Sequence, residues 1–191
     1  MDRIVIVGSP GAGKTTLALR LSKILNIPVF HLDHYFWLPD WKEKPRHVRV
    51  GILKELIQLQ REERWIIEGT YLDSSEPRLN AADTIIFLDI PPWLCLQRII
   101  LRHRKYKRRL RRDLPDGCSD NLNLRCIVKV LVFPARGRRT LNRRLRSHEL
   151  FSSKEIIWLH SDKEVENFLA QHQQGTNDKM DFHILDSVVV A

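Results

Sequence analysis

The chain alternates short apolar runs with longer stretches whose apolar residues recur at helical spacing. Five runs of three to five residues are rich in Ile, Val, Leu and aromatic side chains, which is typical of strands buried on both faces. They cover residues 3–7, 28–32, 65–67, 84–88 and 155–159. Apolar positions three or four residues apart predict helices, at about 14–25, 47–63, 92–102, 124–131, 141–145 and from 162 onward. This alternation predicts an α/β domain whose parallel sheet carries helices on both faces.

The connections between these elements set the expected domain organisation. Residues 34–41 are rich in aromatic side chains and predict a loop. Residues 105–122 are charged and lack apolar periodicity, which predicts a mobile loop or lid. Helical spacing after the lid is interrupted at Phe133-Pro134, and Ser161 or Asp162 is expected to cap the last helix. We therefore expect a single domain over residues 1–172, with a lid at about 103–135, followed by a polar tail over 173–191.

The first predicted strand leads directly into a complete phosphate-binding loop, G-x-x-x-x-G-K-[ST], which a predicted helix follows. Its glycines let the backbone wrap a phosphate closely, and the N–H groups at the start of the helix favour negative charge. Lys14 is expected to reach the β- and γ-phosphates, and the Thr15 hydroxyl to ligate Mg²⁺. The predicted nucleotide-binding residues are Gly8, Ser9, Pro10, Gly11, Ala12, Gly13, Lys14, Thr15 and Thr16. The sequence thus predicts a P-loop α/β domain that binds ATP and Mg²⁺.

Positive charge is concentrated in one segment of the chain. Residues 98–146 hold 17 of the 32 Lys and Arg residues and only three acids, a net charge of +14, whereas the rest of the chain is net −5. Such a segment favours a polyanionic partner, either nucleotide phosphates or a nucleic acid backbone. We interpret several of its basic residues, Arg143 and Arg144 among them, as solvated surface charges.

Cysteine usage and hydropathy indicate a cytoplasmic protein without a membrane partner. Cys95, Cys118 and Cys126 are unevenly spaced and form no C-x-x-C pair, so we interpret them as reduced thiols. No apolar run approaches the length of a membrane span, and the N-terminus shows no signal peptide. These features predict neither a disulfide framework nor a zinc site, and they do not predict an oligomeric state.

Four segments taken together resemble a known family. They read GSPGAGKTTLALRLSKIL, HLDHYFWLPDW, WIIEGTY and PRLNAADTIIFLDIPPWLCLQRIILR, and an RRDLPDGC stretch follows them. This series resembles the small P-loop kinases called DNA topology modulation proteins (FlaR-like), which are similar in turn to adenylate kinase. The match extends over about residues 1–170. The resemblance implies a kinase-like fold with strand order 2-3-1-4-5 and a closing, arginine-rich lid.

The resemblance also implies roles for several arginines. Adenylate-kinase-like enzymes carry an L-x-x-R-x-x-x-R pattern on the helix after the fourth strand, and its arginines match Arg98 and Arg102, although Cys95 replaces the leucine. By resemblance Arg98 lies against the adenine and Arg102 on the phosphates. Arg111 resembles a lid arginine that closes over the transferred phosphoryl group, and Arg138 is a weaker candidate of the same kind. Guanidinium groups suit this task because they bind phosphate oxygens through two parallel hydrogen bonds.

Two acids at strand ends compete for the water-mediated Mg²⁺ role. Glu68 follows the third predicted strand, which in this fold lies beside the P-loop strand, and Asp89 follows the fourth. Topology favours Glu68, although the family commonly has Asp there. Either acid could instead cap a helix or a turn.

The acceptor side of the site is expected at Asp33, which follows the second predicted strand. A carboxylate there could orient or deprotonate an acceptor hydroxyl, or it could simply cap the next turn. Trp37 is a candidate for stacking on the substrate, and the aromatic residues around it could equally form a hydrophobic floor. These neighbours are Tyr35, Phe36 and Trp41. Arg78 resembles the arginine that binds the acceptor phosphate in nucleotide kinases.

Two functions remain open from the sequence. The first is ATP-dependent phosphoryl transfer to a small acceptor such as a nucleoside or a nucleotide. The second is a nucleic-acid-binding P-loop ATPase, or a kinase of polynucleotide ends, that uses the basic segment 98–146. Only Tyr106 interrupts the basic run nearest the lid, so stacking positions for bases are few and the first function is favoured. A GTPase is disfavoured because no N-K-x-D-like segment follows the fourth strand.

Overall fold

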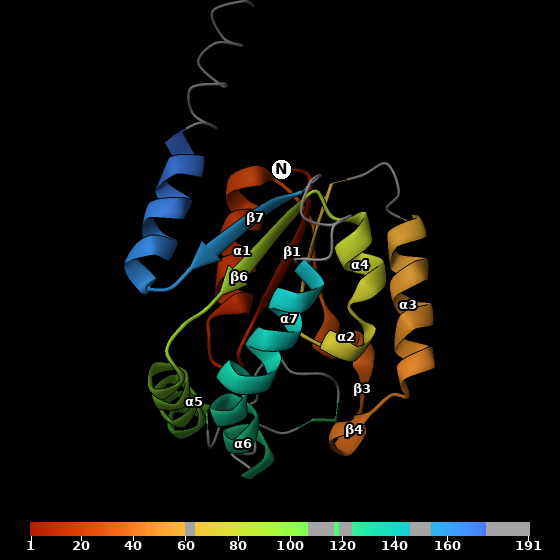
Figure 1. Cartoon of the computed structure of the whole chain (residues 1–191), viewed down its shortest axis with the longest axis vertical. Helices are drawn as coiled ribbons and strands as arrows, with labels where there is room; N and C mark the ends of the chain where they lie inside the picture. The colour runs from red at the N-terminus through yellow and green to blue at the C-terminus, as the bar shows by residue number, and fades with distance from the viewer. Residues whose placement is uncertain (60–63, 107–116, 119–123, 146–153, 175–191) are drawn as a thin grey trace, which may run out of the picture.

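A five-stranded parallel sheet forms the centre of the computed structural model, which describes residues 1–59, 64–106, 117–118, 124–145 and 154–174 (Figure 1). Its strands are β1 (Arg3–Gly8), β2 (Val29–His31), β5 (Trp65–Glu68), β6 (Thr84–Leu88) and β7 (Glu155–Leu159). They lie side by side in the order β2-β5-β1-β6-β7, and each neighbouring pair is parallel. Counted along the chain this is the order 2-3-1-4-5, so the predicted α/β fold class and strand order are confirmed.

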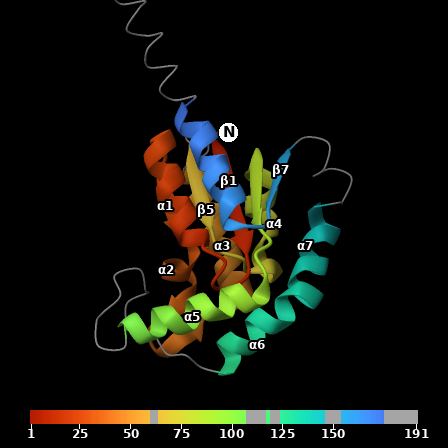
Figure 2. The same cartoon turned by 90° about the vertical axis from the view of Figure 1, so that its left-hand side faces the viewer.

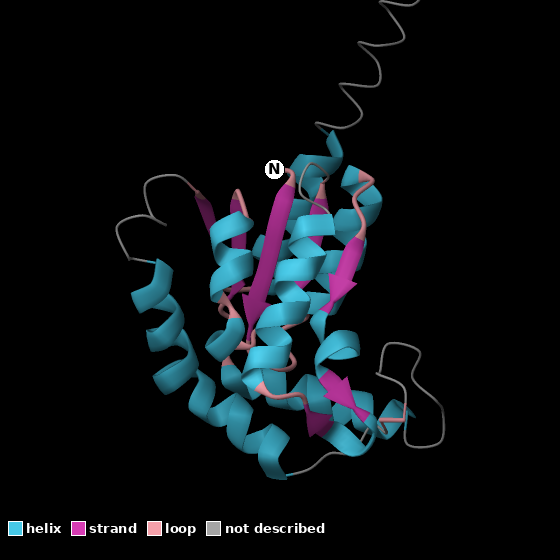
Figure 3. Ribbon diagram, turned by 90° about the vertical axis from the view of Figure 1, so that its right-hand side faces the viewer, coloured by secondary structure: helices cyan, strands magenta, loops and turns pink. Residues whose placement is uncertain are grey.

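Helices cover both faces of this sheet. The helices of one face are α1 (Lys14–Leu25), α5 (Pro92–Tyr106) and the helix of residues 162–174, seen from their side in Figure 2. The helices of the other face are α2 (Leu32–Phe36), α3 (Arg46–Leu59), α4 (Glu76–Ala81) and α7 (Arg138–Leu145), seen from the side of α3 in Figure 3. Successive strand residues point to opposite faces. Ile4 and Ile6 of β1 therefore pack on the first layer, and Val5 and Val7 on the second. The continuous apolar run is what burial on both faces requires.

The expected aromatic loop at 34–41 is instead a short helix followed by a small hairpin. Helix α2 ends at Phe36. The strands β3 (Trp37–Leu38) and β4 (Lys42–Glu43) then pair antiparallel around the 3-10 turn η1 (Pro39–Trp41). Asp40 and Trp41 close this turn with φ of 59° and 56°, in the left-handed region. The sequence pattern did not predict the hairpin, because its strands are only two residues long.

The interruption expected at Phe133-Pro134 is a change of helix type and not an end. Helix α6 (Leu124–Val132) continues through the π-helical turn η3 (Phe133–Gly137) into α7. Pro134 has no N–H to donate and its ring clashes with the preceding turn, so the chain widens locally instead of breaking. The turn also needs Gly137, since a Cβ there would come within 2.4 Å of the Phe133 ring.

The last described helix, residues 162–174, begins with a cap made by the side chains of Ser161 and Glu164. The Ser161 hydroxyl accepts the N–H of Glu164 at 3.3 Å, and the Glu164 carboxylate accepts the N–H of His160 at 2.9 Å. Of the two caps predicted, Ser161 is therefore the one that forms. Among the described residues, none of the helices has the length and apolar character needed to cross a membrane.

Candidate functional site

The phosphate-binding loop joins the end of β1 to the start of α1, as the motif requires. Gly11 has φ of 79°, and a Cβ at this position would lie 2.4 Å from the carbonyl oxygen of Cys95 on α5. Gly13, with φ of 95°, caps α1 and completes the turn. The Nζ of Lys14 donates to the carbonyl oxygen of Ser9 at 3.0 Å, so the amine lies across the loop. The lysine amine and the backbone of the loop thus lie together where the motif places a phosphate.

Glu68 stands directly beside this loop at the end of β5. Its Oε1 accepts the hydroxyl of Thr15 at 3.1 Å and lies 2.9 Å from Nδ1 of His31. His31 is paired in register with Glu68 across β2 and β5, so the sheet itself holds the two side chains together. Burial raises the pKa of the Glu68 carboxyl, but the hydrogen bond from His31 and the charge of Lys14 outweigh burial and hold that pKa below its ordinary value. The carboxylate is therefore charged and acceptor-only, and His31 is its donor.

Asp89, the competing acid, faces a different part of the molecule. Its carboxylate lies 3.1 Å from Nη2 of Arg138 and 3.4 Å from Nδ1 of His160. These three residues line part of a cavity of about 320 Å³, which Ser9 of the phosphate-binding loop also borders. Its remaining lining residues are Ile90, Pro91, Pro92, Phe133 and Pro134. The structure thus brings Glu68, and not Asp89, to Thr15.

The donor set at Thr15 and Glu68 fits Mg²⁺. A hydroxyl and a carboxylate are the oxygen donors that this cation prefers, and Mg²⁺ commonly combines one or two protein oxygens with phosphates of the substrate. In the described ranges, no group of three or more His, Cys, Asp or Glu side chains is placed to hold a metal ion.

Of the two arginines predicted on α5, Arg98 contacts the phosphate-binding loop. Arg98 donates to the carbonyl oxygen of Ala12 at 3.3 Å and forms an ion pair with Asp162 at the start of the last helix. Arg98 is thereby fixed between the loop and the helix that follows β7. Arg102 lies one turn further along α5 and is half-buried. Thr16 is exposed on α1, and Arg111 lies outside the described residues.

Asp33 lies in the first turn of α2, where it is exposed, at the edge of the sheet that also carries the phosphate-binding loop. Its Oδ1 accepts a hydrogen bond from the hydroxyl of Tyr71. The same hydroxyl accepts the indole N–H of Trp37 at 2.5 Å. Trp37 also contacts the Trp41 ring, with centroids 5.4 Å apart, and the ammonium of Lys129 lies 5.5 Å above it. Trp37 is thus packed against other side chains of the protein.

Arg78 is buried beside the loop that follows β5. Its side chain is 0% exposed, and its Nη2 donates to the carbonyl oxygens of Gly69 and Thr70, at 3.0 and 2.5 Å respectively. Burial lowers the pKa of this guanidinium to about 9. Arg78 thus stabilises the loop after β5 through the carbonyl oxygens of that loop.

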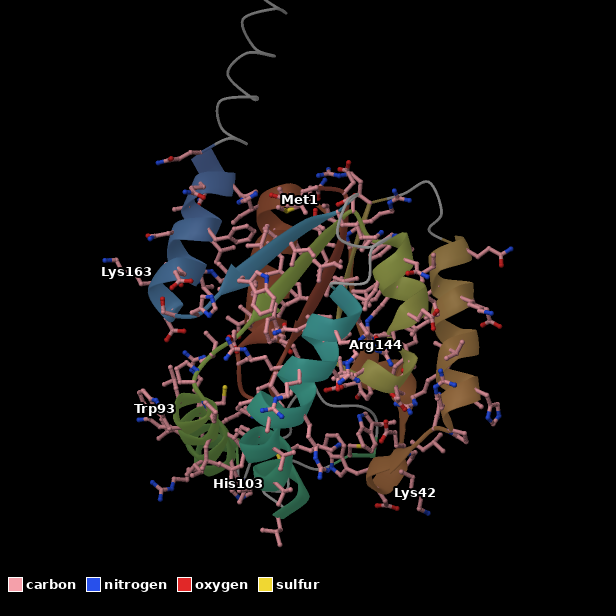
Figure 4. The ribbon with its side chains drawn as sticks, in the orientation of Figure 1. Met1, Lys42, Trp93, His103, Arg144 and Lys163 are labelled. Atoms are coloured by element: carbon pink, nitrogen blue, oxygen red, sulfur yellow. The ribbon has the colours of Figure 1, made fainter. Side chains whose placement is uncertain are left out.

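Arg144 is not the solvated charge that the sequence suggested. From α7 it reaches the segment before α4, where Nη1 donates to the Ser75 hydroxyl at 2.7 Å (Figure 4). It ties α7 to the turn η2 (Leu72–Ser74) and to α4.

Sequence reasoning assigned no role to Tyr71 or Thr70. Tyr71 bonds two of the three predicted acceptor residues, Asp33 and Trp37, and the Thr70 hydroxyl bonds the backbone of Gly8, accepting its N–H at 3.2 Å. A signal was present, because both residues directly follow a buried strand that ends at the ligand-binding edge. Their roles depend on a loop conformation that residue spacing does not encode.

Comparison with known proteins places this site in context. A family model described as an AAA domain matches residues 4–116. The uncharacterized protein YqaC of Bacillus subtilis is 29% identical over 149 residues, which cover 76% of this chain and 80% of that protein. The deoxyadenosine kinase of Dictyostelium discoideum is also 29% identical, over 53% of this chain and 57% of its own length, so the chain spans just over half of that relative.

The fold is shared with solved shikimate kinases. The enzyme from Bacteroides thetaiotaomicron superposes with a TM-score of 0.51 at 21% identity, covering 91% of this chain and 97% of that one. The enzyme from Acinetobacter baumannii, solved with shikimate, gives a TM-score of 0.51 at 17% identity, covering 97% and 94%. The chain therefore has a P-loop kinase-like fold.

Proposed function

Because this chain belongs to the AAA domain family, we propose that its P-loop site transfers a phosphoryl group from ATP-Mg²⁺ to a hydroxyl of a small acceptor. The acceptor we favour is a nucleoside or a comparable alcohol. The finer assignment to the FlaR-like kinases remains part of this proposal and rests on the HLD-x-x-x-W and RRD-x-x-x-GC segments.

One observation carries the proposal. The structure gathers Lys14, the hydrogen-bonded Thr15–Glu68 pair and the exposed Asp33 at the carboxyl edge of one parallel sheet. Phosphoryl transfer requires cationic stabilisation of the phosphates, an oxygen-lined metal position and a group that orients the attacking hydroxyl. Each requirement is matched by one of these groups.

The reaction follows from their chemistry. Lys14 and the backbone N–H groups of the loop hold the β- and γ-phosphates, and Thr15 and Glu68 would hold Mg²⁺, which neutralises phosphate charge when bound. Asp33 orients the acceptor hydroxyl and takes its proton as the oxygen attacks the γ-phosphorus. The new O–P bond forms while the bond to the ADP oxygen breaks. Arg98, Arg102 and Arg111 are the arginines proposed to secure the nucleotide and the transferred group.

The acceptor side favours a hydroxyl compound over a monophosphate. Arg78, the arginine expected for an acceptor phosphate, is buried against two carbonyl oxygens. Arg49, 5% exposed, is held by ion pairs with Glu43 and Asp73. Both guanidiniums are thus buried and already bonded to groups of the protein. The deoxyadenosine kinase relative supports the same class of acceptor.

The test is ADP release from ATP and Mg²⁺ with matched acceptors: nucleosides, the corresponding monophosphates and 5′-hydroxyl oligonucleotides. We expect turnover with a nucleoside or another small alcohol, and its loss in Lys14→Ala. Lys23→Ala, which removes an exposed lysine of the same helix, serves as the matched control. Turnover with oligonucleotides alone would favour the polynucleotide function, which the similar proteins do not support. ATP turnover that is unchanged in Lys14→Ala would refute the site.

A further inference from the structure

Tyr71 has a backbone conformation that calls for an explanation. Its φ of 21° and ψ of 63° lie at positive φ, outside the regular helical and extended regions, where a bulky side chain is rarely found. The residues before it are bonded to the P-loop strand: Gly69 N–H donates to the carbonyl oxygen of Ile6 at 3.1 Å, and the Thr70 hydroxyl bonds both backbone groups of Gly8. The chain therefore enters Tyr71 from a fixed point at the phosphate-binding loop.

The ring of Tyr71 is held on its other sides as well. Phe36 packs edge-on against it, with ring centroids 4.7 Å apart at 76°. The guanidinium of Arg49 lies 5.7 Å from the centroids of both rings and is itself fixed by Glu43 and Asp73. Packing and a cation over the ring thus leave the tyrosine a single orientation.

The hydroxyl of Tyr71 has a defined direction of donation. The indole Nε1 of Trp37 is a donor only, so the hydroxyl must accept from it and give its own proton to Oδ1 of Asp33. Burial and the neighbouring Asp33 charge raise the pKa of Tyr71 above its ordinary value, which keeps this donor protonated. With Oδ1 engaged, Oδ2 of Asp33 has no donor within the described part of the chain and is left for a substrate hydroxyl.

We propose that Tyr71 is the positioning residue of the acceptor site, whose hydroxyl fixes the Asp33 carboxylate for the attacking alcohol; this inference rests on the phosphoryl transfer proposed above. Tyr71 links the two halves of the site, because one bonded path runs from the phosphate-binding loop through Thr70 to Tyr71 and Asp33. It acts through Asp33 and does not itself touch the reacting atoms.

The test is Tyr71→Phe, which removes the hydroxyl and keeps the ring. We expect kcat with the best acceptor to fall by about tenfold to a hundredfold, because a misplaced reactive group loses that much. KM for ATP and the midpoint of thermal unfolding should stay near their wild-type values. Tyr35→Phe is the matched control, since among described residues no hydrogen bond to the Tyr35 hydroxyl occurs.

A double-mutant cycle with Asp33→Asn separates positioning from a purely structural role. If Tyr71 acts through Asp33, Tyr71→Phe lowers the residual kcat of Asp33→Asn by less than twofold. An equal loss in both backgrounds, or an unchanged kcat in Tyr71→Phe alone, would overturn the inference while leaving phosphoryl transfer intact.

A readout that needs no turnover accompanies the kinetics. The indole N–H resonance of Trp37, assigned by its loss in Trp37→Phe, should shift in Tyr71→Phe and exchange faster with solvent. An unshifted resonance would show that the hydrogen bond does not form and would overturn the inference. If the wild-type protein transfers phosphate to no acceptor, the proposed function fails, and the role of Tyr71 fails with it.

Discussion

Gly11 is the position where the phosphate-binding loop passes closest to another element. A Cβ would meet the carbonyl oxygen of Cys95, part of the backbone of α5, and φ is positive. Neither conflict can be relieved by rotating a side chain. At the scale of single residues, the conformation of the loop therefore requires a residue without a Cβ at position 11.

Gly11→Ala is expected to weaken ATP binding at least about tenfold and to lower the free energy of unfolding by about 1–2 kcal/mol, the cost of left-handed backbone at a residue with a Cβ. Isothermal titration with ATP and urea unfolding measure the two effects. Gly51→Ala is the control, because this glycine lies inside α3 with open space around it. That change should stabilise the protein by about 0.5–1 kcal/mol. ATP affinity at the wild-type level in Gly11→Ala would contradict the geometry.

At the scale of elements, Asp83 fastens the start of β1 to the start of β6. Its carboxylate accepts the N–H of Arg3 at 2.8 Å, the N–H of Asp2 at 3.1 Å and the Thr84 hydroxyl at 2.7 Å. Burial raises the pKa of Asp83, but the donors at Arg3 and Thr84 outweigh it and hold the pKa below its ordinary value. A lowered carboxyl pKa means that the charged form stabilises the fold.

This stabilisation should therefore be present above about pH 4, the ordinary value for Asp, and be lost as the pH falls below it. We expect Asp83→Asn to lower the free energy of unfolding by about 1 kcal/mol at pH 7, a figure reduced because the carboxyl is one-third exposed. The deficit should shrink at pH 3.5 in urea unfolding. Asp40→Asn, in the exposed η1 turn, is the control. An equal deficit at both pH values would show that charge is not the cause.

Elements differ in how well the sequence predicts them, for a physical reason. The strands of the main sheet and the helices α1, α3 and α5 were predictable because burial imposes a regular apolar pattern. The β3–β4 hairpin and the π-helical turn at Pro134 were not, because they depend on short pairings and on how a local defect is absorbed. The same division holds in the site: the phosphate-binding loop is a local motif, whereas Tyr71 and the burial of Arg78 arise from packing between distant segments.

At the scale of the whole molecule, ligand binding should be visible as stability. A ligand that binds only the folded chain adds about 2.7 kcal/mol at a hundred times its Kd. For a domain of this size that corresponds to a rise of roughly 5–11 °C in the midpoint of thermal unfolding. A comparison of this rise with and without Mg²⁺ can therefore decide whether Glu68 or Asp89 is the acid that serves Mg²⁺.

We expect ATP with Mg²⁺ to stabilise the wild-type protein more than ATP with EDTA. Glu68→Gln should lose this Mg²⁺-dependent part, since Glu68 is bonded to Thr15. Asp89→Asn should retain it, because Asp89 faces Arg138 and His160. Differential scanning calorimetry with each nucleotide mixture measures the difference. Loss in Asp89→Asn and retention in Glu68→Gln would reverse the assignment.

The central place of β1 has a consequence for the newly made chain. Both neighbours of this strand, β5 and β6, come later in the sequence, so β1 has no partner until residue 68 has been synthesised. The ribosome therefore releases Ile4–Val7 as an unpaired apolar segment, of the kind that aggregates when it is exposed. A fragment that ends before β5 should be insoluble, whereas one that includes β6 can bury both edges of its first strand. The strand that presents the nucleotide loop thus gains both of its partners only after residue 88 has been made.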